Sequence, residues 1–89
     1  MLDIASLITI STAHISEQTA LMLEFAPQKC DMPVYAMERY GWLIFVCSQD
    51  ETPYDDLNEV AKFAEQHHCE WVRLDPDGDI VDGLPVYDW

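Results

Sequence analysis

The sequence predicts an α+β domain, with a small mixed or antiparallel sheet, two helices on one face of it and the element order β-α-β-β-α-β-β. Short runs of branched and aromatic residues are typical of strands, and two other segments combine a capping residue with apolar residues at helical spacing. Turn-forming Pro and Gly residues separate these segments. The 89 residues suffice for one domain, residues 1–89, with a small core.

The first elements are expected to be a strand and a helix. Leu2–Ile10 is rich in Ile and Leu, as a mostly buried strand would be. Ser16 is placed to cap a helix over Glu17–Phe25, because a serine hydroxyl accepts hydrogen bonds from the free N–H groups at a helix start. Pro27 is expected to end this helix.

A hairpin is expected next. Val34–Met37 and Trp42–Cys47 would form its arms, with Arg39–Gly41 as the turn. Side chains of the second arm alternate between two faces of the sheet, and both sets are apolar. We therefore expect this strand to be covered on both sides, by the helices on one side and by the C-terminal tail or a second copy of the chain on the other.

The second helix has the most complete start signal in the chain. Thr52 is expected to be its N-cap and Pro53 its first residue, with Asp55 and Asp56 in the first turn, where negative charge suits the helix dipole. The buried stripe is expected to consist of apolar residues at helical spacing: Leu57, Val60, Ala61 and Ala64.

The C-terminal part is expected to contain a strand, a turn and a short returning strand. These are Trp71–Leu74, Asp75–Asp79 and Ile80–Val81. The tail, Gly83–Trp89, ends in apolar and aromatic residues, and such a terminus seldom remains free in water. We expect it to pack along the sheet or over a hydrophobic face, including that of a neighbouring subunit.

The formal net charge of -13 is the strongest indication of function. Three Trp, four Tyr and three Phe predict that this charge lies on a folded surface, because disordered acidic chains are poor in aromatic residues. Such a surface repels phosphate backbones and attracts basic grooves, which argues against direct binding of nucleic acid. The longest apolar run, Trp42–Cys47, is far shorter than the roughly 20 residues that cross a bilayer, so we expect a cytoplasmic protein with no membrane contact.

The acidic residues are concentrated in the second half of the chain. Residues 50–89 hold twelve acidic residues against two basic ones, a formal charge of -10, and the rest of the chain contributes -3. We expect the second helix and the acidic turn to contact a basic protein surface that itself binds nucleic acid. The predicted contact residues are Asp55, Asp56, Glu59, Asp75, Asp77, Asp79 and Asp82. The alternative is that the charge only keeps the domain soluble.

No metal site or cofactor is expected. The three cysteines, Cys30, Cys47 and Cys69, are widely spaced and fit neither a disulfide framework nor paired zinc half-sites. His67 and His68 next to Cys69 would point in different directions at a helix end, which is poor geometry for tetrahedral coordination. Asp75–Asp79 resembles the start of a calcium loop, but the later glycine and glutamate of such loops are missing.

One segment is a candidate for a small active site. His14 lies among hydroxyl residues, Ser11 and Thr12, where the first strand leads into the first helix. The chain has no glycine-rich phosphate loop and no nucleophile elbow, and a structural histidine is the competing interpretation. A third possibility is a self-associating protein, a homodimer for example, held together by its exposed apolar residues: Trp42, Phe45, Val86 and Trp89.

The chain resembles an uncharacterised family of short bacterial proteins that is classified as a domain of unknown function. The resemblance rests on the Ser-Thr-Ala-His-Ile segment at Ser11–Ile15, on Tyr40-Gly41-Trp42 and on the Gly-Leu-Pro-Val-Tyr-Asp-Trp ending at Gly83–Trp89, and it covers nearly the whole chain. It implies a bacterial cytoplasmic or mobile-element setting but no activity. It also marks His14 and Trp89 as residues of interest.

Overall fold

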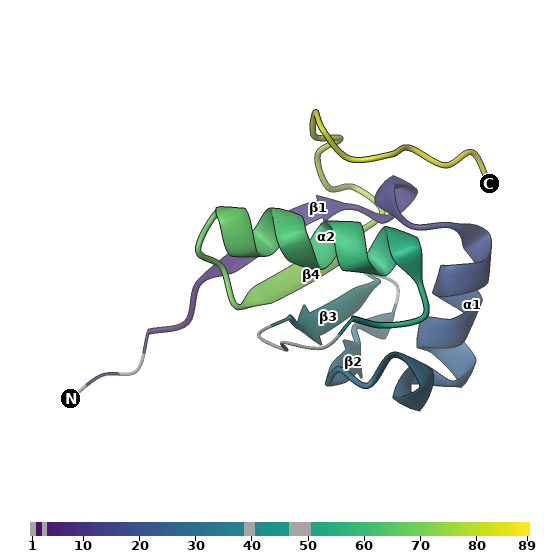
Figure 1. Cartoon of the computed structure of the whole chain (residues 1–89), viewed down its shortest axis with the longest axis horizontal. Coiled ribbons are helices and arrows are strands. Elements are labelled where there is room, and N and C mark those ends of the chain that lie inside the picture. The colour runs from purple at the N-terminus through teal and green to yellow at the C-terminus, as the bar shows by residue number, and fades with distance from the viewer. Residues whose placement is uncertain (1, 3, 39–40, 47–50) are drawn as a thin grey trace.

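The structure is a computed structural model that describes residues 2, 4–38, 41–46 and 51–89. As far as β4, the strands and α-helices follow the predicted order, and Figure 1 shows both α-helices on the same side of one sheet. The elements are β1 (Leu7–Ser11), η1 (Thr12–His14), α1 (Glu17–Phe25), η2 (Pro27–Cys30), β2 (Val34–Ala36), β3 (Trp42–Phe45), α2 (Asp55–Gln66) and β4 (Trp71–Asp75). The predicted α+β class is confirmed.

The sheet is mixed, with the strand order β1-β4-β3-β2. β1 pairs parallel with β4, whereas β4 with β3 and β3 with β2 are antiparallel. The register brings Ile10 beside Leu74 and Val72 beside Ile44, so that their side chains share the face under the helices. All four side chains are fully buried, and Leu57 and Val60 of α2 are at most 1% exposed. The core therefore lies between this face and the two helices.

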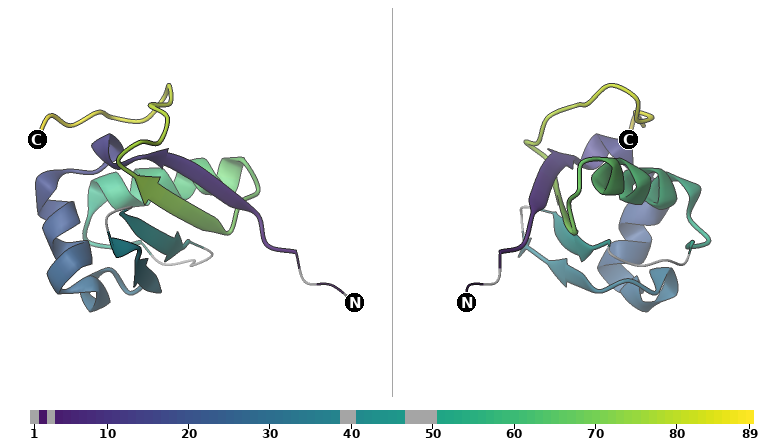
Figure 2. Two further views of the ribbon diagram at one scale, coloured as in Figure 1. Left: turned by 180° about the vertical axis from the view of Figure 1, so that it is seen from behind. Right: turned by 60° about the vertical axis from the view of Figure 1, so that its left-hand side comes forward.

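The opposite face, called the open sheet face here, is not covered by a helix. It carries the alternate residues of the strands: Leu7, Thr9, Tyr35, Leu43, Phe45, Trp71 and Arg73. Figure 2 (left) shows this face from behind, with the C-terminal tail lying above it and not across it. The expectation that the tail covers this side of the sheet is thus wrong. Leu7 and Tyr35 are 46% and 55% exposed.

Several predicted boundaries differ from the structure for tertiary reasons. The first strand begins at Leu7 and not at Leu2, because its only partner in the described residues, β4, begins at Trp71 opposite Leu7. Leu2 and Ile4 are 87% and 84% exposed. Arg39 and Tyr40 of the predicted hairpin turn, and Cys47 at the end of its second arm, lie outside the described residues.

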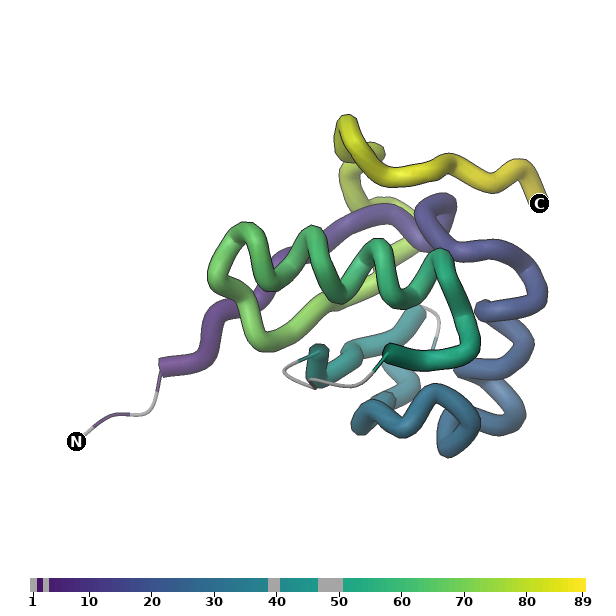
Figure 3. Tube along the Cα trace, in the orientation of Figure 1, coloured from purple at the N-terminus to yellow at the C-terminus, as the bar shows by residue number. Residues whose placement is uncertain are grey.

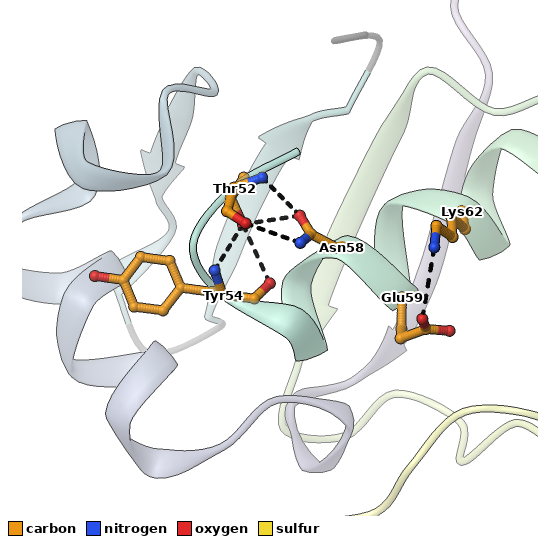
Figure 4. Close-up of polar contacts among 5 residues, drawn as sticks. All are labelled: Thr52, Tyr54, Asn58, Glu59 and Lys62. Carbon is orange, nitrogen blue, oxygen red and sulfur yellow. Dashed lines mark hydrogen bonds and ion pairs between the residues drawn. The ribbon is translucent and has the colours of Figure 1, made fainter. Parts of the chain in front are cut away.

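The second helix begins at Asp55, two residues later than predicted, and Thr52 does not cap it. Thr52 instead interlocks with Asn58: its N–H and hydroxyl donate to Asn58 Oδ1 at 2.8 and 2.9 Å, and Asn58 Nδ2 donates to the Thr52 carbonyl at 2.9 Å (Figure 4). The first helix agrees with the prediction at both ends, and the Ser16 hydroxyl accepts from Thr19 N–H at 3.2 Å.

The predicted strand Ile80–Val81 is absent from the structure. The turn before it forms, with Asp77 N–H donating to Asp75 Oδ1 at 2.8 Å and Gly78 N–H donating to the Asp75 carbonyl at 2.9 Å. A Cβ on Gly78 would lie 2.6 Å from the backbone of Ile10, so only glycine fits this close approach. After the turn the chain leaves the sheet, because Val81 N–H bonds to the ring of His14 and not to a neighbouring strand. Within the described residues, no helix is long and apolar enough to cross a membrane.

Candidate functional site

The C-terminal tail packs along the segment that connects β1 to α1. Tyr87 N–H donates to the Ala13 carbonyl at 2.8 Å, and Trp89 Nε1 donates to the Ile15 carbonyl at 2.8 Å. Leu84 is only 8% exposed. Figure 3 traces the tail past η1 to an end near the start of α1. The tail is therefore a structural part of the domain, as expected, although it packs on η1 and not on the sheet.

His14 is the side chain that fastens this tail. It is fully buried, and its ring bonds to backbone on both sides. Because a carbonyl can only accept, Nδ1 donates to the Pro85 carbonyl at 2.8 Å; because an N–H can only donate, Nε2 accepts from Val81 N–H at 3.0 Å. These contacts require the neutral ring with its proton on Nδ1.

The residues predicted to accompany His14 are not bonded to its ring in the described structure. The Ser11 hydroxyl accepts from Ala13 N–H at 3.0 Å and so caps η1. Thr12 belongs to η1 and is half-buried. A general base needs a free nitrogen within reach of a reacting group. Both nitrogens of His14 are already used, so this arrangement favours a structural role over catalysis.

Asp56 connects the starts of the two helices. It is 7% exposed, and its Oδ2 accepts from Ser16 N–H at 2.7 Å. Its Oδ1 accepts from the Thr19 hydroxyl at 2.8 Å and from Leu57 N–H at 2.9 Å. Three hydrogen bonds to one carboxylate stabilise its negative charge at this nearly buried position. Asp56 therefore has to be removed from the predicted contact surface, because its charge is used inside the domain.

The other predicted contact residues remain near solvent. Asp75 is half-buried and accepts from Asp77 in the turn. The remaining five are exposed: Asp55, Glu59, Asp77, Asp79 and Asp82. Among all seventeen acidic residues, Asp3 and Asp50 lie outside the described part, and thirteen of the other fifteen are exposed.

Internal ion pairing neutralises little of this charge. In the part of the chain that the structure describes, one salt bridge occurs, between Lys62 Nζ and Glu59 Oε1 at 3.8 Å on α2 (Figure 4). Both side chains are more than half exposed, and such surface pairs contribute little. Arg73 Nε donates to the Thr9 hydroxyl at 3.1 Å on the open sheet face. The exposed carboxylates are thus presented to solvent.

A first cleft, of about 310 Å³, lies where the helix starts meet the tail. Its lining comes from α1, the loop before α2, α2 itself and the tail: Ser16, Gln18, Thr19, Pro53, Tyr54, Asp55, Asp56 and Tyr87. Burial, and then the charges of Asp56, Asp55 and Glu59, raise the pKa of the Tyr87 hydroxyl above its ordinary value of 10.0. The tail therefore lies in the negative potential of the first two turns of α2.

A second cleft, of about 440 Å³, lies between α1, β3 and the end of the tail. It is called the tryptophan cleft here and is lined by Glu17, Ala20, Leu21, Glu24, Trp42 and Trp89. Trp42 and Trp89 were expected to take part in self-association, and the resemblance also marked Trp89, but neither glutamate was expected to line a site. The signal was present in the i, i+3, i+4, i+7 spacing of the α1 residues, which places them on one helix face.

Residues 7–89 match the model of a family described as "Family of unknown function (DUF5983) C-terminal domain". The chain belongs to this family. No curated protein and no solved structure matches it. The resemblance seen in the sequence is thereby confirmed, and the family description carries no activity.

In this DUF5983 domain, two of the three segments that carried the resemblance, Ser11–Ile15 and Gly83–Trp89, contact each other. Ala13, His14 and Ile15 all bond to the tail, through Tyr87, Pro85 and Trp89 respectively. His14 and Trp89, which the resemblance marked, each supply a side chain to this contact. The contact between Ser11–Ile15 and Gly83–Trp89 gives a physical reason why both segments are characteristic of the sequence.

The side chains of the His67–Cys69 segment make local contacts. His67 stacks on Phe63 with ring centroids 4.5 Å apart, and Cys69 Sγ donates to the His67 carbonyl at 3.5 Å. Over the described ranges, no group of three or more His, Cys, Asp or Glu side chains converges in a geometry that could hold a metal ion.

Proposed function

We propose that this domain is a non-enzymatic, acidic protein-binding module that occupies a basic, nucleic-acid-binding surface of a partner protein in the cytoplasm. The observation that carries the proposal is the solvent exposure of thirteen carboxylates in the described structure, of which only Glu59 is in a salt bridge there. Charges that are neither buried nor paired remain available to a partner of opposite charge. An inhibitor encoded by a phage or plasmid would use such a surface.

The contact surface would be centred on α2 and the acidic turn. Asp55 and Glu59 lie on the first turns of α2, and Asp55 lines a cleft together with Tyr87 of the tail. Asp77 and Asp79 are exposed in the turn, and Asp82 is exposed just before the tail. A groove that binds phosphates presents Lys and Arg side chains, to which these carboxylates are complementary. The same charges repel nucleic acid itself, so the partner is a protein.

The proposal is tested by capture from a lysate of the cells that encode the chain. The immobilised domain is expected to retain basic nucleic-acid-binding proteins and to release them between about 50 and about 200 mM salt, because charge-dominated binding weakens steeply over that range. Added duplex DNA should also release them. Mass spectrometry identifies the retained proteins. Retention that does not depend on salt or DNA, or retention of no basic protein, would contradict the proposal.

The open sheet face supports a second candidate, self-association. Its aromatic side chains contact one another, with ring centroids 4.9 Å apart for Phe45 and Trp71 and 6.0 Å apart for Tyr35 and Trp71. A second copy would bury this apolar surface. The other residues predicted for self-association do not share it, because Trp42 faces the helices and Val86 and Trp89 belong to the tail.

Salt separates the two candidates because it acts in opposite directions on them. Two copies of a chain with charge -13 repel each other, so a homodimer is expected to become stronger as salt screens the repulsion. Binding to a basic partner becomes weaker. Sedimentation equilibrium over the same salt range measures the dimer, and Phe45→Glu, on the open sheet face, should abolish dimer formation. A monomer at every salt concentration and protein concentration removes the second candidate.

A further inference from the structure

We propose that the tryptophan cleft binds an arginine side chain of the basic partner, together with an apolar residue beside it. This inference rests on the proposed function and adds to it a defined site, outside the predicted contact residues. Within the described structure, the cleft combines exposed aromatic surface with two carboxylates. A volume of about 440 Å³ is within the range of ligand pockets, which is roughly 300–1,000 Å³.

The floor of the cleft is apolar and held in place. Ala20 and Leu21 supply the helix surface, and Leu21 is 52% exposed although it lies in the middle of α1. Trp42 packs against the core at its side. Trp89 is fixed by the hydrogen bond from Nε1 to the Ile15 carbonyl, at 2.8 Å, and still leaves 52% of its surface exposed. An aromatic ring that is both anchored and accessible is suited to stacking.

The rim of the cleft is negative. Glu17 and Glu24 are exposed, and the one salt bridge among the described residues does not involve them. They are seven residues apart on α1, which corresponds to about 10 Å along the helix axis at 1.5 Å per residue. A purely apolar occupant would displace water molecules that are hydrogen-bonded to these carboxylates. It would offer no hydrogen bonds in their place, which is unfavourable. The occupant must therefore carry positive charge as well as apolar surface.

Arginine meets both requirements better than other cations. Its guanidinium is flat, stacks on indole rings and donates in pairs to a carboxylate, whereas the ammonium of lysine is compact and strongly hydrated. A divalent metal ion would need several oxygen ligands in a small volume, and two carboxylates about 10 Å apart do not provide them. The methylene groups of arginine and a neighbouring Leu would contact Leu21 and the rings.

The test uses the full chain and a defined probe, the peptide Ac-Gly-Leu-Arg-Leu-Gly-NH₂, with a citrulline peptide of the same length as the uncharged counterpart. NMR resolves the indole N–H signals of the chain's three tryptophans. The arginine peptide is expected to shift the signals of Trp42 and Trp89 and to leave that of Trp71, which lies on the open sheet face, unchanged. The citrulline peptide should bind more weakly by up to about fivefold, the upper range for the loss of one exposed charged contact.

Matched variants separate the cleft from general charge. Glu17→Gln with Glu24→Gln should weaken binding of the arginine peptide by up to about fivefold, the upper range for the loss of one exposed ion pair, whichever glutamate forms it. Glu65→Gln with Glu70→Gln changes the net charge equally, at exposed positions outside the cleft, and should change the affinity less than twofold. An unchanged indole spectrum of each free variant verifies the fold.

Two outcomes would overturn the inference. One is equal weakening by both variant pairs, and the other is equal binding of the arginine and citrulline peptides. In either case salt-dependent capture of a basic partner from the lysate could still succeed, and the proposed function would then stand without this site. If capture fails while the arginine peptide binds as described, the site stands and the proposed partner class is wrong.

Discussion

Replacing Asp56 by Ala is expected to lower the free energy of unfolding by about 3 kcal/mol, because the carboxylate accepts from three donors, and two of them would be left buried without a partner. In a domain of this size that corresponds to a fall in melting temperature of roughly 10–20 °C. Ser16 is the N-cap of α1, Thr19 lies in its first turn and Asp56 belongs to α2, so the substitution also removes a connection between the helix starts. Urea denaturation followed by circular dichroism measures the change.

Asp55→Ala is the matched control. Asp55 lies one residue earlier in the same helix turn but is exposed, so only its interaction with the helix dipole is lost, about 0.3–1 kcal/mol. Equal losses for Asp55→Ala and Asp56→Ala would show that the carboxylate of Asp56 does not join the helices as described.

Replacing His14 by Ala should destabilise the domain by about 3 kcal/mol, the sum expected for a buried cavity and two lost hydrogen bonds. The tail should also detach, because Pro85 and Val81 lose their partner. The amide of Tyr87, which bonds to Ala13, should then exchange with solvent much faster. Thermal denaturation and hydrogen exchange measure the two effects.

His14→Phe distinguishes the contributions of His14, since it leaves no cavity, places a somewhat larger ring there and removes both hydrogen bonds. We expect it to detach the tail with a smaller loss of stability. His67→Ala is the control, because His67 is exposed. Loss of function in His14→Ala at an unchanged melting temperature would instead indicate that His14 is catalytic.

The sequence predicted an element correctly where the residues that begin and end it are its direct neighbours in the chain. The bounds of α1 follow from the Ser16 cap and from Pro27, both adjacent to the helix, and the structure confirms them. The start of α2 was predicted too early because the Thr52 hydroxyl accepts from Tyr54 N–H at 3.1 Å and donates to Asn58 Oδ1 at 2.9 Å, so Thr52 shapes a turn before the helix and does not cap it. Leu2 and Ile4 have the composition of a strand, but the residues opposite them do not form one.

The candidate sites depend on contacts between distant residues, which one sequence does not reveal. Asp55 and Asp56 are the same residue type in the same helix turn. Only the contact of Asp56 with Ser16, 40 residues away in the sequence, shows that Asp56 and not Asp55 is buried. Trp42 and Trp89 form one cleft although they are 47 residues apart in the sequence. The tail was correctly expected to pack, because its apolar composition requires it; its position on η1 follows from His14, whose ring had been considered for catalysis.

The decisive experiment is competition between this domain and duplex DNA for one purified partner. The domain is expected to displace the DNA completely, and no complex should contain all three molecules. The logarithm of the affinity should fall linearly with the logarithm of the salt concentration. A stable complex of partner, DNA and domain, or an affinity that does not depend on salt, would contradict the proposed function.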